Sequence, residues 1–272
     1  MNEINRPAAF LRPPTTRWPL TVVAAADITP RMRRVSLVGE AMERFEFRPG
    51  QDLVLNLPSD GGPHDTGTLR RHYTIRRFDR AEGRLEIDFV LHGRSPATTW
   101  AKGAAIGDEI TADGPRGRTS VRGEADWRLF TGDETALPGI AAMIESLPAG
   151  ETGIAFIEVA DASEEQPIET AATVEITWLH RSGSPQAPSL GLLEALTTFQ
   201  LPPGEGQACI IGETSTVRAQ RQGLIARGFP KDRIAAEGYW RPGRVGSHDH
   251  IIEPSEFVAA AFSRIGRGGR RG

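Results

Sequence analysis

Four consecutive residues, Arg71, His72, Tyr73 and Thr74, place a cation, a flat ring and a hydroxyl group side by side. They lie between two segments that resemble β-strands. Because side chains on a strand alternate in direction, we expect Arg71 and Tyr73 to share one face and Thr74 to point to the other. A planar, phosphorylated cofactor needs such groups. A buried strand tyrosine beside a surface arginine is the alternative interpretation.

A second segment, residues 88–101, indicates a strand, a glycine turn and the start of a helix rich in hydroxyl groups. Unpaired amides at a helix N-terminus, together with the hydroxyls of Thr98 and Thr99, are suited to holding a phosphate. The same turn could equally be an ordinary capped helix. The candidate cofactor-binding residues of this segment are Asp88, Val90, His92, Thr98, Thr99 and Trp100.

Two turns in the second half of the chain each follow a strand and lead into a helix. The candidate dinucleotide-binding residues in them are Gly132, Asp133, Glu134 and Thr135 in the first turn, and Gly212 and Glu213 in the second. An open parallel sheet binds dinucleotides outside the carboxyl ends of its strands. The first turn lacks the G-x-G-x-x-G pattern, so a standard Rossmann pyrophosphate loop is not supported. Both turns could also be simple helix caps.

The elements around these residues predict two domains. Six short apolar alternations between residues 20 and 113 predict an antiparallel six-stranded β-barrel. From Trp127 onward, strands alternate with helices, which predicts an α/β domain with a parallel sheet. We expect domains at 17–120 and 126–262, with the boundary in 118–125, and a disordered tail at 263–272.

Composition excludes several classes of protein. The 272 residues include 32 Lys and Arg against 35 Asp and Glu, a formal charge of -3, which does not favour a nucleic-acid or an acidic-membrane partner. The single cysteine, Cys209, excludes an internal disulfide and a cysteine-ligated cluster, and it fits a reducing cytoplasm. No stretch reaches the roughly 20 apolar residues of a membrane span. The pair His248 and His250 is insufficient for a metal site, so none is predicted.

Taken together, the motifs resemble those of the siderophore-interacting proteins, a flavin-dependent branch of the ferredoxin-reductase-like family. The segments that carry the resemblance, in chain order, are Arg71-His72-Tyr73-Thr74, Asp88 to Gly93 with Trp100-Ala101, Gly114 to Gly117, Gly132 to Pro138, Gly212-Glu213 with Val217-Arg218, and Gly238 to Arg241. The resemblance spans nearly the whole chain. It implies a barrel that binds FAD, an α/β domain that binds NADPH or NADH, and reduction of ferric siderophores to release Fe(II).

The resemblance also implies roles for individual residues. Tyr73 would pack against the isoalloxazine ring, Thr74 would hydrogen-bond near its N5 atom, and these two are the candidate catalytic residues. Arg71, with His72 beside it, would contact the FAD phosphates, and His92 would lie at the same end. The six residues of the two later turns would border the nicotinamide dinucleotide.

Local positive charge is needed to attract an anionic ferric siderophore to a chain of net charge -3. Our candidate substrate-binding residues are Arg48, Arg116 and Arg241. Val54 stands where relatives often carry a lysine, which weakens a full basic triad. Arg181 after the strand 174–179 is a candidate for the NADPH 2′-phosphate, whereas Glu158 argues for NADH.

The predicted function is therefore an FAD-dependent ferric-siderophore reductase of the cytoplasm that takes electrons from NADPH or NADH. One alternative is a ferredoxin-reductase-like flavin oxidoreductase with another acceptor or with ferredoxin as its donor. A siderophore-binding module without electron transfer is the alternative from a different class.

Overall fold

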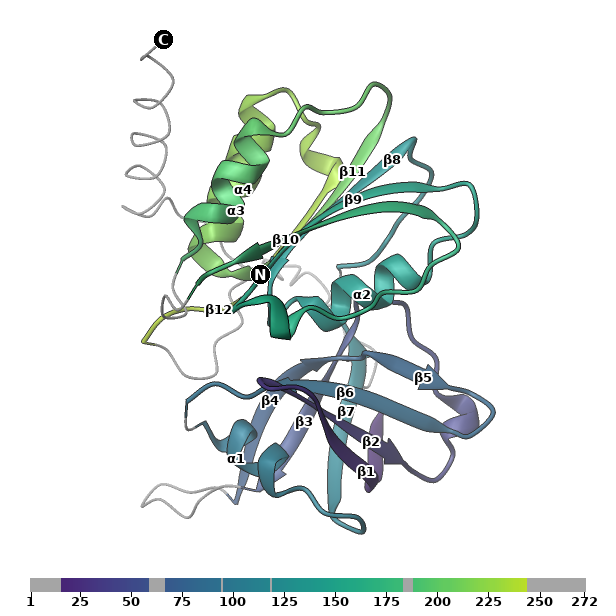
Figure 1. Cartoon of the computed structure of the whole chain (residues 1–272). Helices are drawn as coiled ribbons and strands as arrows, with labels where there is room; N and C mark the ends of the chain where they lie inside the picture. The colour runs from purple at the N-terminus through teal and green to yellow at the C-terminus, as the bar shows by residue number, and fades with distance from the viewer. Residues whose placement is uncertain (1–15, 59–66, 94, 118, 183–187, 244–272) are drawn as a thin grey trace, which may run out of the picture.

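The computed structural model describes residues 16–58, 67–93, 95–117, 119–182 and 188–243. These residues form two sheets, and each half of the chain contributes one of them. Figure 1 shows the N-terminal sheet with helix α1 in the lower part of the view and the C-terminal sheet with its helices above it.

The N-terminal half is an antiparallel sheet of seven strands in the order β4-β3-β7-β1-β2-β6-β5. Its elements are β1 (Arg17–Thr29), β2 (Met32–Val38), β3 (Asp52–Pro58), β4 (Thr68–Thr74), β5 (Arg77–Asp79), β6 (Arg84–Val90), α1 (Pro96–Gly103) and β7 (Glu109–Arg116). The sequence predicts six strands, and the additional one is β5. Three residues are too few to show the alternation from which strands are recognised.

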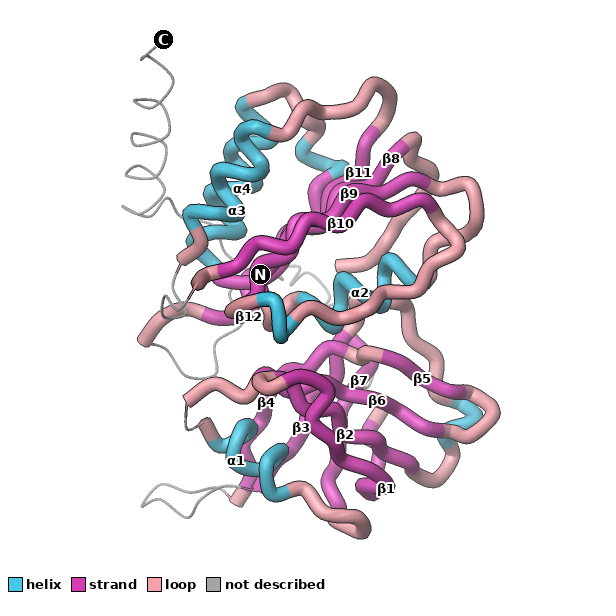
Figure 2. Tube along the Cα trace, viewed as in Figure 1, coloured by secondary structure: helices cyan, strands magenta, loops and turns pink. Residues whose placement is uncertain are grey.

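The two ends of this strand order come together, as the predicted barrel requires. Directly after β4, the amide of Arg76 donates to the carbonyl of Glu86 in β6 at 3.0 Å. Inside, the rings of Tyr73 and Phe89 lie 4.2 Å apart between their centroids and also join β4 to β6. Inward-facing leucines from β3 and an enclosed Phe45 fill the core. Figure 2 shows these strands wrapped around one another.

The C-terminal half is a parallel sheet of five strands in the order β10-β9-β8-β11-β12. Its elements are β8 (Trp127–Asp133), α2 (Leu137–Glu145), β9 (Thr152–Val159), β10 (Thr173–His180), α3 (Leu190–Thr198), β11 (Gly206–Glu213), α4 (Thr214–Ala226) and β12 (Ile234–Trp240). Helices α3 and α4 cover one face, and α2 lies on the other, between the sheet and the barrel (Figure 1). The predicted fold class is thus confirmed.

Buried polar contacts join the halves. The guanidinium of Arg76 donates to both carboxylate oxygens of Glu145 in α2, at 2.7 and 2.6 Å. The hydroxyl of Thr29 donates to Glu164 at 2.6 Å. Because buried partners cannot exchange these bonds for water without cost, they fix the orientation of the second half on the barrel. The predicted boundary at 118–125 lies between the end of β7 and the start of β8.

Candidate active site

Strand β4 presents its side chains as the alternation predicts. Arg71 and Tyr73 pair with Leu55 and Leu53, and both leucines are fully enclosed on the core side. Thr74 pairs with Asp52 and therefore lies on the opposite face. The expected division of β4 into an Arg71 and Tyr73 face and a Thr74 face is confirmed.

Tyr73 belongs to an aromatic cluster at the junction of β4, β6 and α1. Its ring packs on Phe89, and Phe89 lies 5.6 Å from Trp100 between ring centroids. Burial raises the pKa of the Tyr73 phenol, so this group stays neutral near pH 7 and acts by packing rather than by proton transfer. Tyr73 and Trp100 both stay partly exposed, which leaves an aromatic edge for a flat ligand.

Of the predicted residues in and beyond β6, Asp88 is engaged within the protein. Its carboxylate accepts two hydrogen bonds from Arg34, at 2.7 and 2.8 Å, and it is buried. Val90 ends the strand half-buried, whereas His92 is exposed in the following turn. Asp88 therefore stabilises the strand, and His92 remains accessible to a ligand.

The first turn of α1 is capped by Ser95. Its oxygen accepts from the Thr98 amide at 3.1 Å, and its hydroxyl donates to the Thr98 hydroxyl at 3.0 Å. Thr98 is buried, whereas Thr99 is exposed. The capped-helix interpretation therefore holds for Thr98, and the phosphate-binding role rests with the exposed Thr99 and the helix amides.

Two adjacent arginines on β4 differ in their partners. Arg70 lies 3.1 Å from Asp113, which also accepts from Arg17 at 2.8 Å. Arg71 donates to the carbonyl of Arg70 at 2.9 Å, and no carboxylate in the described ranges pairs with it. His72, on the Arg70 side, lies 2.5 Å from Asp52 through Nδ1. Arg71 is thus the cation of this strand that remains available to a phosphate.

The Asp113 cluster predicts how stability depends on pH. Hydrogen bonds from Arg17 hold the pKa of the Asp113 carboxyl below its ordinary value of 3.8. The pKa of Asp113 is lower in the folded state than in the unfolded state. The stabilisation is therefore fully present above the pKa of the unfolded state, and it disappears as the pH falls through the pKa of the folded state. We expect Asp113→Asn to unfold more easily in urea at pH 6, by about 1 kcal/mol or less. The difference from the parent should shrink steadily as the pH falls below the ordinary carboxyl pKa of 3.8. A difference that stays the same as the pH falls would contradict this cause.

Thr74 lies where the two halves meet. It is buried, and its hydroxyl oxygen lies 3.3 Å from that of Tyr239 in β12. A Cβ on Gly139 in α2 would lie 3.1 Å from Thr74 Cγ2, so the start of that helix also packs against it. The end of the strand that carries Arg71 and Tyr73 thus touches two elements of the second half.

Asp133 organises the carboxyl ends of three strands. Its Oδ1 accepts from the amide and the hydroxyl of Thr135, at 2.9 and 2.5 Å. Its Oδ2 accepts from the Glu213 amide and the Trp240 indole N–H, both at 2.8 Å. Burial raises the pKa of Asp133, and these donors oppose that shift. The carboxylate is therefore a structural centre that borders the expected dinucleotide position.

The two predicted glycines are places of close approach. A Cβ on Gly132 would lie 2.5 Å from the Cβ of Ala136 and 2.6 Å from the carbonyl oxygen of Ile211. Gly212 has a φ of 133°, and a Cβ there would lie 2.7 Å from Asp133 Oδ2. Neither position has room for a side chain, so backbone lines this edge of the sheet.

Glu213 caps helix α4. Its carboxylate accepts from the amides of Ser215 and Thr216, at 3.0 and 2.8 Å, and from the hydroxyls of both residues. This geometry corresponds to the cap interpretation of the second turn. Glu213 therefore positions α4 beside Gly212, and its carboxylate is occupied by the helix.

Arg181 forms a bidentate ion pair with Glu134. Its Nη2 lies 2.6 Å from one oxygen of Glu134, its Nη1 contacts the other, and Nη1 also lies 3.5 Å from Glu158. Ser189 donates to the second oxygen of Glu158. Burial raises the pKa of Glu158. Arg181 and Glu158, which bear on the choice of nicotinamide, are thus linked with Glu134 in one cluster beyond β8, β9 and β10.

The candidate substrate arginines occupy different elements. Arg48 is exposed before β3, and Arg116 is half-buried at the end of β7, in register with Asp52. Their loops touch, because a Cβ on Gly50 would collide with the carbonyl of Thr119. Arg241 follows β12 and is half-buried.

Val54, which stands where relatives often carry a lysine, is only 1% exposed. Its side chain therefore does not face a substrate. On the neighbouring strand β4, His72 pairs with Val54 in register.

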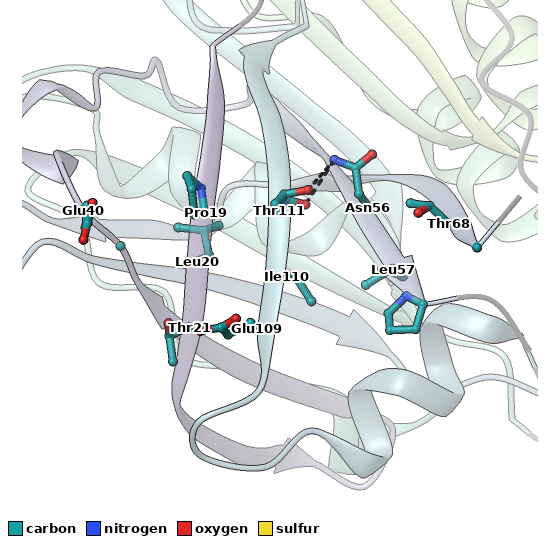
Figure 3. Close-up of a pocket in the computed structure, with 13 residues that line it drawn as sticks. Pro19, Leu20, Thr21, Glu40, Asn56, Leu57, Thr68, Glu109, Ile110 and Thr111 are labelled. Atoms are coloured by element: carbon teal, nitrogen blue, oxygen red, sulfur yellow. Dashed lines mark hydrogen bonds between the residues drawn. The ribbon is translucent and has the colours of Figure 1, made fainter.

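One pocket of about 490 Å³ opens elsewhere on the barrel. Strands β1, β3, β4 and β7 line it, and in Figure 3 Asn56 donates to the Thr111 hydroxyl at 3.1 Å across its rim. Its lining includes none of the predicted site residues. We assign it no role in the chemistry.

Within the described ranges, no cluster of three His, Cys, Asp or Glu side chains is suited to a metal ion. The pair His248 and His250 and the predicted tail lie outside those ranges. No helix in the described parts of the chain is long and apolar enough to cross a membrane.

Tyr239 and Phe89 are site residues that sequence reasoning did not assign. The signal for Tyr239 is its position within the segment Gly238-Tyr239-Trp240-Arg241, which carries part of the resemblance. The sequence pattern indicates only that Phe89 is an inward-facing residue of a strand. Their roles depend on contacts between distant segments, which spacing along the chain does not reveal.

These features fit FAD. The partly exposed aromatic edge of Tyr73 and Trp100 corresponds to contacts with the ring, the available guanidinium of Arg71 to contacts with the pyrophosphate, and the exposed Thr99 in the first turn of α1 to contacts with a phosphate. A barrel with this donor set, joined to a parallel α/β sheet, defines a two-domain flavin- and nicotinamide-binding protein.

Comparison with known proteins identifies the family. Residues 59–119 match the model described as siderophore-interacting FAD-binding domain, and residues 125–243 match that described as siderophore-interacting protein. A siderophore utilization protein from T. fusca has a similar structure, with a TM-score of 0.80 and 36% identity over 87% of this chain and 97% of that one. The chain belongs to the siderophore-interacting protein family.

The relatives include proteins whose names describe an activity. Ferric vibriobactin reductase ViuB of Vibrio cholerae is 31% identical over 88% of this chain and 96% of its own length. NADPH-dependent ferric-chelate reductase of Escherichia coli is 26% identical over 81% of this chain and 91% of its own length. The predicted family is confirmed, and FAD with a nicotinamide nucleotide are the cofactors that the matched domains fit.

Proposed function

We propose that this protein is an FAD-dependent ferric-siderophore reductase that acts in the cytoplasm. One observation carries the proposal: Thr74, next to the candidate flavin-packing residue Tyr73, contacts both Gly139 in α2 and Tyr239 in β12. A flavin held on β4 would therefore face the nicotinamide domain. The reductase names of the relatives support the same activity.

The protein contributes binding and geometry to this reaction. FAD supplies the conversion between the two electrons of a nicotinamide and the single electron that Fe(III) accepts. Tyr73 and Trp100 would provide the wall against which the ring packs, Arg71 would neutralise phosphate charge, and Thr74 would hydrogen-bond at the ring edge. Hard oxygen ligands bind Fe(III) more tightly than Fe(II), so reduction releases the metal.

The ferric chelate would bind near the junction. Arg48 and Arg116, whose loops touch, and Arg241 directly after β12 are our candidates for the positive charge that attracts it. A local concentration of cations attracts an anionic chelate although the whole chain has a net charge of -3. The siderophore is the substrate, and its iron is cargo rather than a resident cofactor.

Stopped-flow spectroscopy tests the function directly. The FAD-loaded protein is mixed with NADPH, NADH or reduced ferredoxin, and then with a ferric chelate in the presence of an Fe(II)-trapping dye. We expect bleaching of the flavin by a nicotinamide, and recovery of its colour with formation of Fe(II). A chelate that binds but never reoxidises the flavin would instead identify a carrier module. Bleaching by ferredoxin alone would make that protein the donor.

We further propose NADPH as the preferred nicotinamide, with Arg181 as the residue that selects it. Glu134 competes with a 2′-phosphate for this guanidinium. We expect Glu134→Gln to lower the KM for NADPH about 3- to 10-fold more than the KM for NADH, since one charge-assisted contact is relieved.

A matched control for that prediction is Glu165→Gln. Glu165 accepts from His180 at 2.7 Å, one residue before Arg181, but does not touch the arginine. Steady-state kinetics with both nucleotides should show no change in preference for this variant. Equal shifts for both nucleotides in Glu134→Gln would refute a role for Arg181 in the choice.

A further inference from the structure

Tyr239 brings a hydroxyl group from the nicotinamide domain to the residue expected at the flavin N5 atom. The oxygens of Tyr239 and Thr74 lie 3.3 Å apart, although 165 positions separate them in the chain. Thr74 is buried, and Tyr239 is the partner that the described residues offer to its hydroxyl. A buried hydroxyl of this kind retains its partner because leaving it unpaired is costly.

The position of Tyr239 is fixed by its neighbours. The next residue, Trp240, donates its indole N–H to Asp133 at 2.8 Å, and its carbonyl accepts from the Thr214 hydroxyl at 3.0 Å. A Cβ on Gly238 would lie 2.5 Å from the Thr214 hydroxyl oxygen, so the strand runs tightly against α4. Both flanks of Tyr239 are thereby anchored, and its phenol is held toward the barrel.

Two hydroxyl groups in contact suit a partner that changes its hydrogen-bonding character. Each hydroxyl has one proton to donate and lone pairs to accept. An oxidised flavin N5 is an acceptor, so Thr74 would donate to it and accept from Tyr239. A reduced N5–H is a donor, so Thr74 would accept from it and donate to Tyr239. Burial raises the pKa of Tyr239, so the phenol stays protonated in both arrangements, and its O–H points to Thr74 only in the first.

We propose that Tyr239 is a positioning residue that lets the Thr74 hydroxyl serve as donor to the oxidised flavin and as acceptor to the reduced one. The proposal rests on the flavin-dependent function proposed above. It predicts a larger effect of Tyr239 on the reduced state than on the oxidised state. Without the phenol, the Thr74 proton has no acceptor among the residues that the structure describes when N5–H donates. An unpaired donor costs more than an unused lone pair.

The test is an equilibrium redox titration of FAD-loaded protein against a reference dye. For Tyr239→Phe, which keeps the ring, we expect the ratio of reduced to oxidised flavin at a given potential to fall roughly tenfold. For a two-electron couple this corresponds to a midpoint potential about 30 mV lower. Thr74→Val should also shift the potential, and adding Tyr239→Phe to it should produce no further change.

Thr119→Val is the matched control. The Thr119 hydroxyl donates to Glu237 at 2.6 Å. Glu237 lies in β12, two residues before Tyr239, so this variant also removes a hydroxyl hydrogen bond between the halves. It should leave the potential unchanged. An equal shift in Thr119→Val would overturn the proposal and indicate a general effect of domain docking.

The outcomes separate the inference from the function. If the parent protein binds FAD and is reduced by a nicotinamide, but Tyr239→Phe has the same midpoint potential as the parent, the positioning role is refuted and the reductase function stands. A parent that takes up no FAD refutes both. Should Tyr239→Phe fold poorly, Thr74→Ser and Thr74→Val test the hydroxyl on which the proposal depends. The serine variant retains the hydroxyl and should retain the parental potential, and equal potentials in the two variants would overturn the proposal.

Discussion

Replacing Arg71 with alanine is expected to weaken FAD binding roughly 10- to 100-fold. A charge-assisted hydrogen bond to phosphate contributes about 1.5–3 kcal/mol, and each 1.4 kcal/mol corresponds to about a factor of ten in Kd. Arg71 is the β4 arginine without a carboxylate partner among the described residues, so its charge is available to the pyrophosphate. Quenching of flavin fluorescence on titration of the apoprotein measures the change.

The neighbouring arginine provides the control for this prediction. Arg70 carries the same charge one residue away, but it lies on the opposite face of β4 and 3.1 Å from Asp113. We expect Arg70→Ala to change the Kd for FAD by less than about threefold, because a partly exposed ion pair contributes little. Arg71→Lys should be intermediate, since an ammonium lacks the fork geometry of a guanidinium. Similar losses in Arg70→Ala and Arg71→Ala would show that only general charge matters.

The face on which Arg71 and Tyr73 lie could be predicted because strand alternation is a local property. The same holds for the parallel sheet, whose strands and helices repeat with recognisable periods. Strand β5 could not be predicted, because its three residues form a strand only through pairing with β6.

Contacts between distant segments explain the remaining differences. The sequence offers Arg181 as a cation for a phosphate, but only folding shows that Glu134, 47 residues earlier, already binds it. Glu213 was a candidate ligand, yet its carboxylate caps α4, a position where Ser, Thr, Asp and Asn are more usual. Tyr239 meets Thr74 only because the two halves dock through bonds such as that between Arg76 and Glu145.

Replacing Asp133 with asparagine is expected to lower the free energy of unfolding by about 2–4 kcal/mol. Both carboxylate oxygens accept two hydrogen bonds, Oδ1 from Thr135 and Oδ2 from Glu213 and Trp240. An asparagine must place its NH₂ group on one side or the other, where it faces two donors. The lost bonds hold the turns that carry the dinucleotide site, so the KM for NADPH should rise as well. Urea unfolding of the apoprotein measures the first effect.

Asp161, in the turn that follows β9, offers a close control in the same half of the protein. Its Oδ1 accepts from the amide and the hydroxyl of Ser163, the residue two positions on, as Asp133 Oδ1 does with Thr135. Asp161 is exposed, and its Oδ2 accepts no bond from the described residues, so an asparagine there can turn its NH₂ group to water. We expect Asp161→Asn to unfold at nearly the parental urea concentration. If both variants lose a comparable free energy of unfolding, the two hydrogen bonds from Thr135 account for the contribution of Asp133. The bonds from Glu213 and Trp240, which link three strands, would then contribute little.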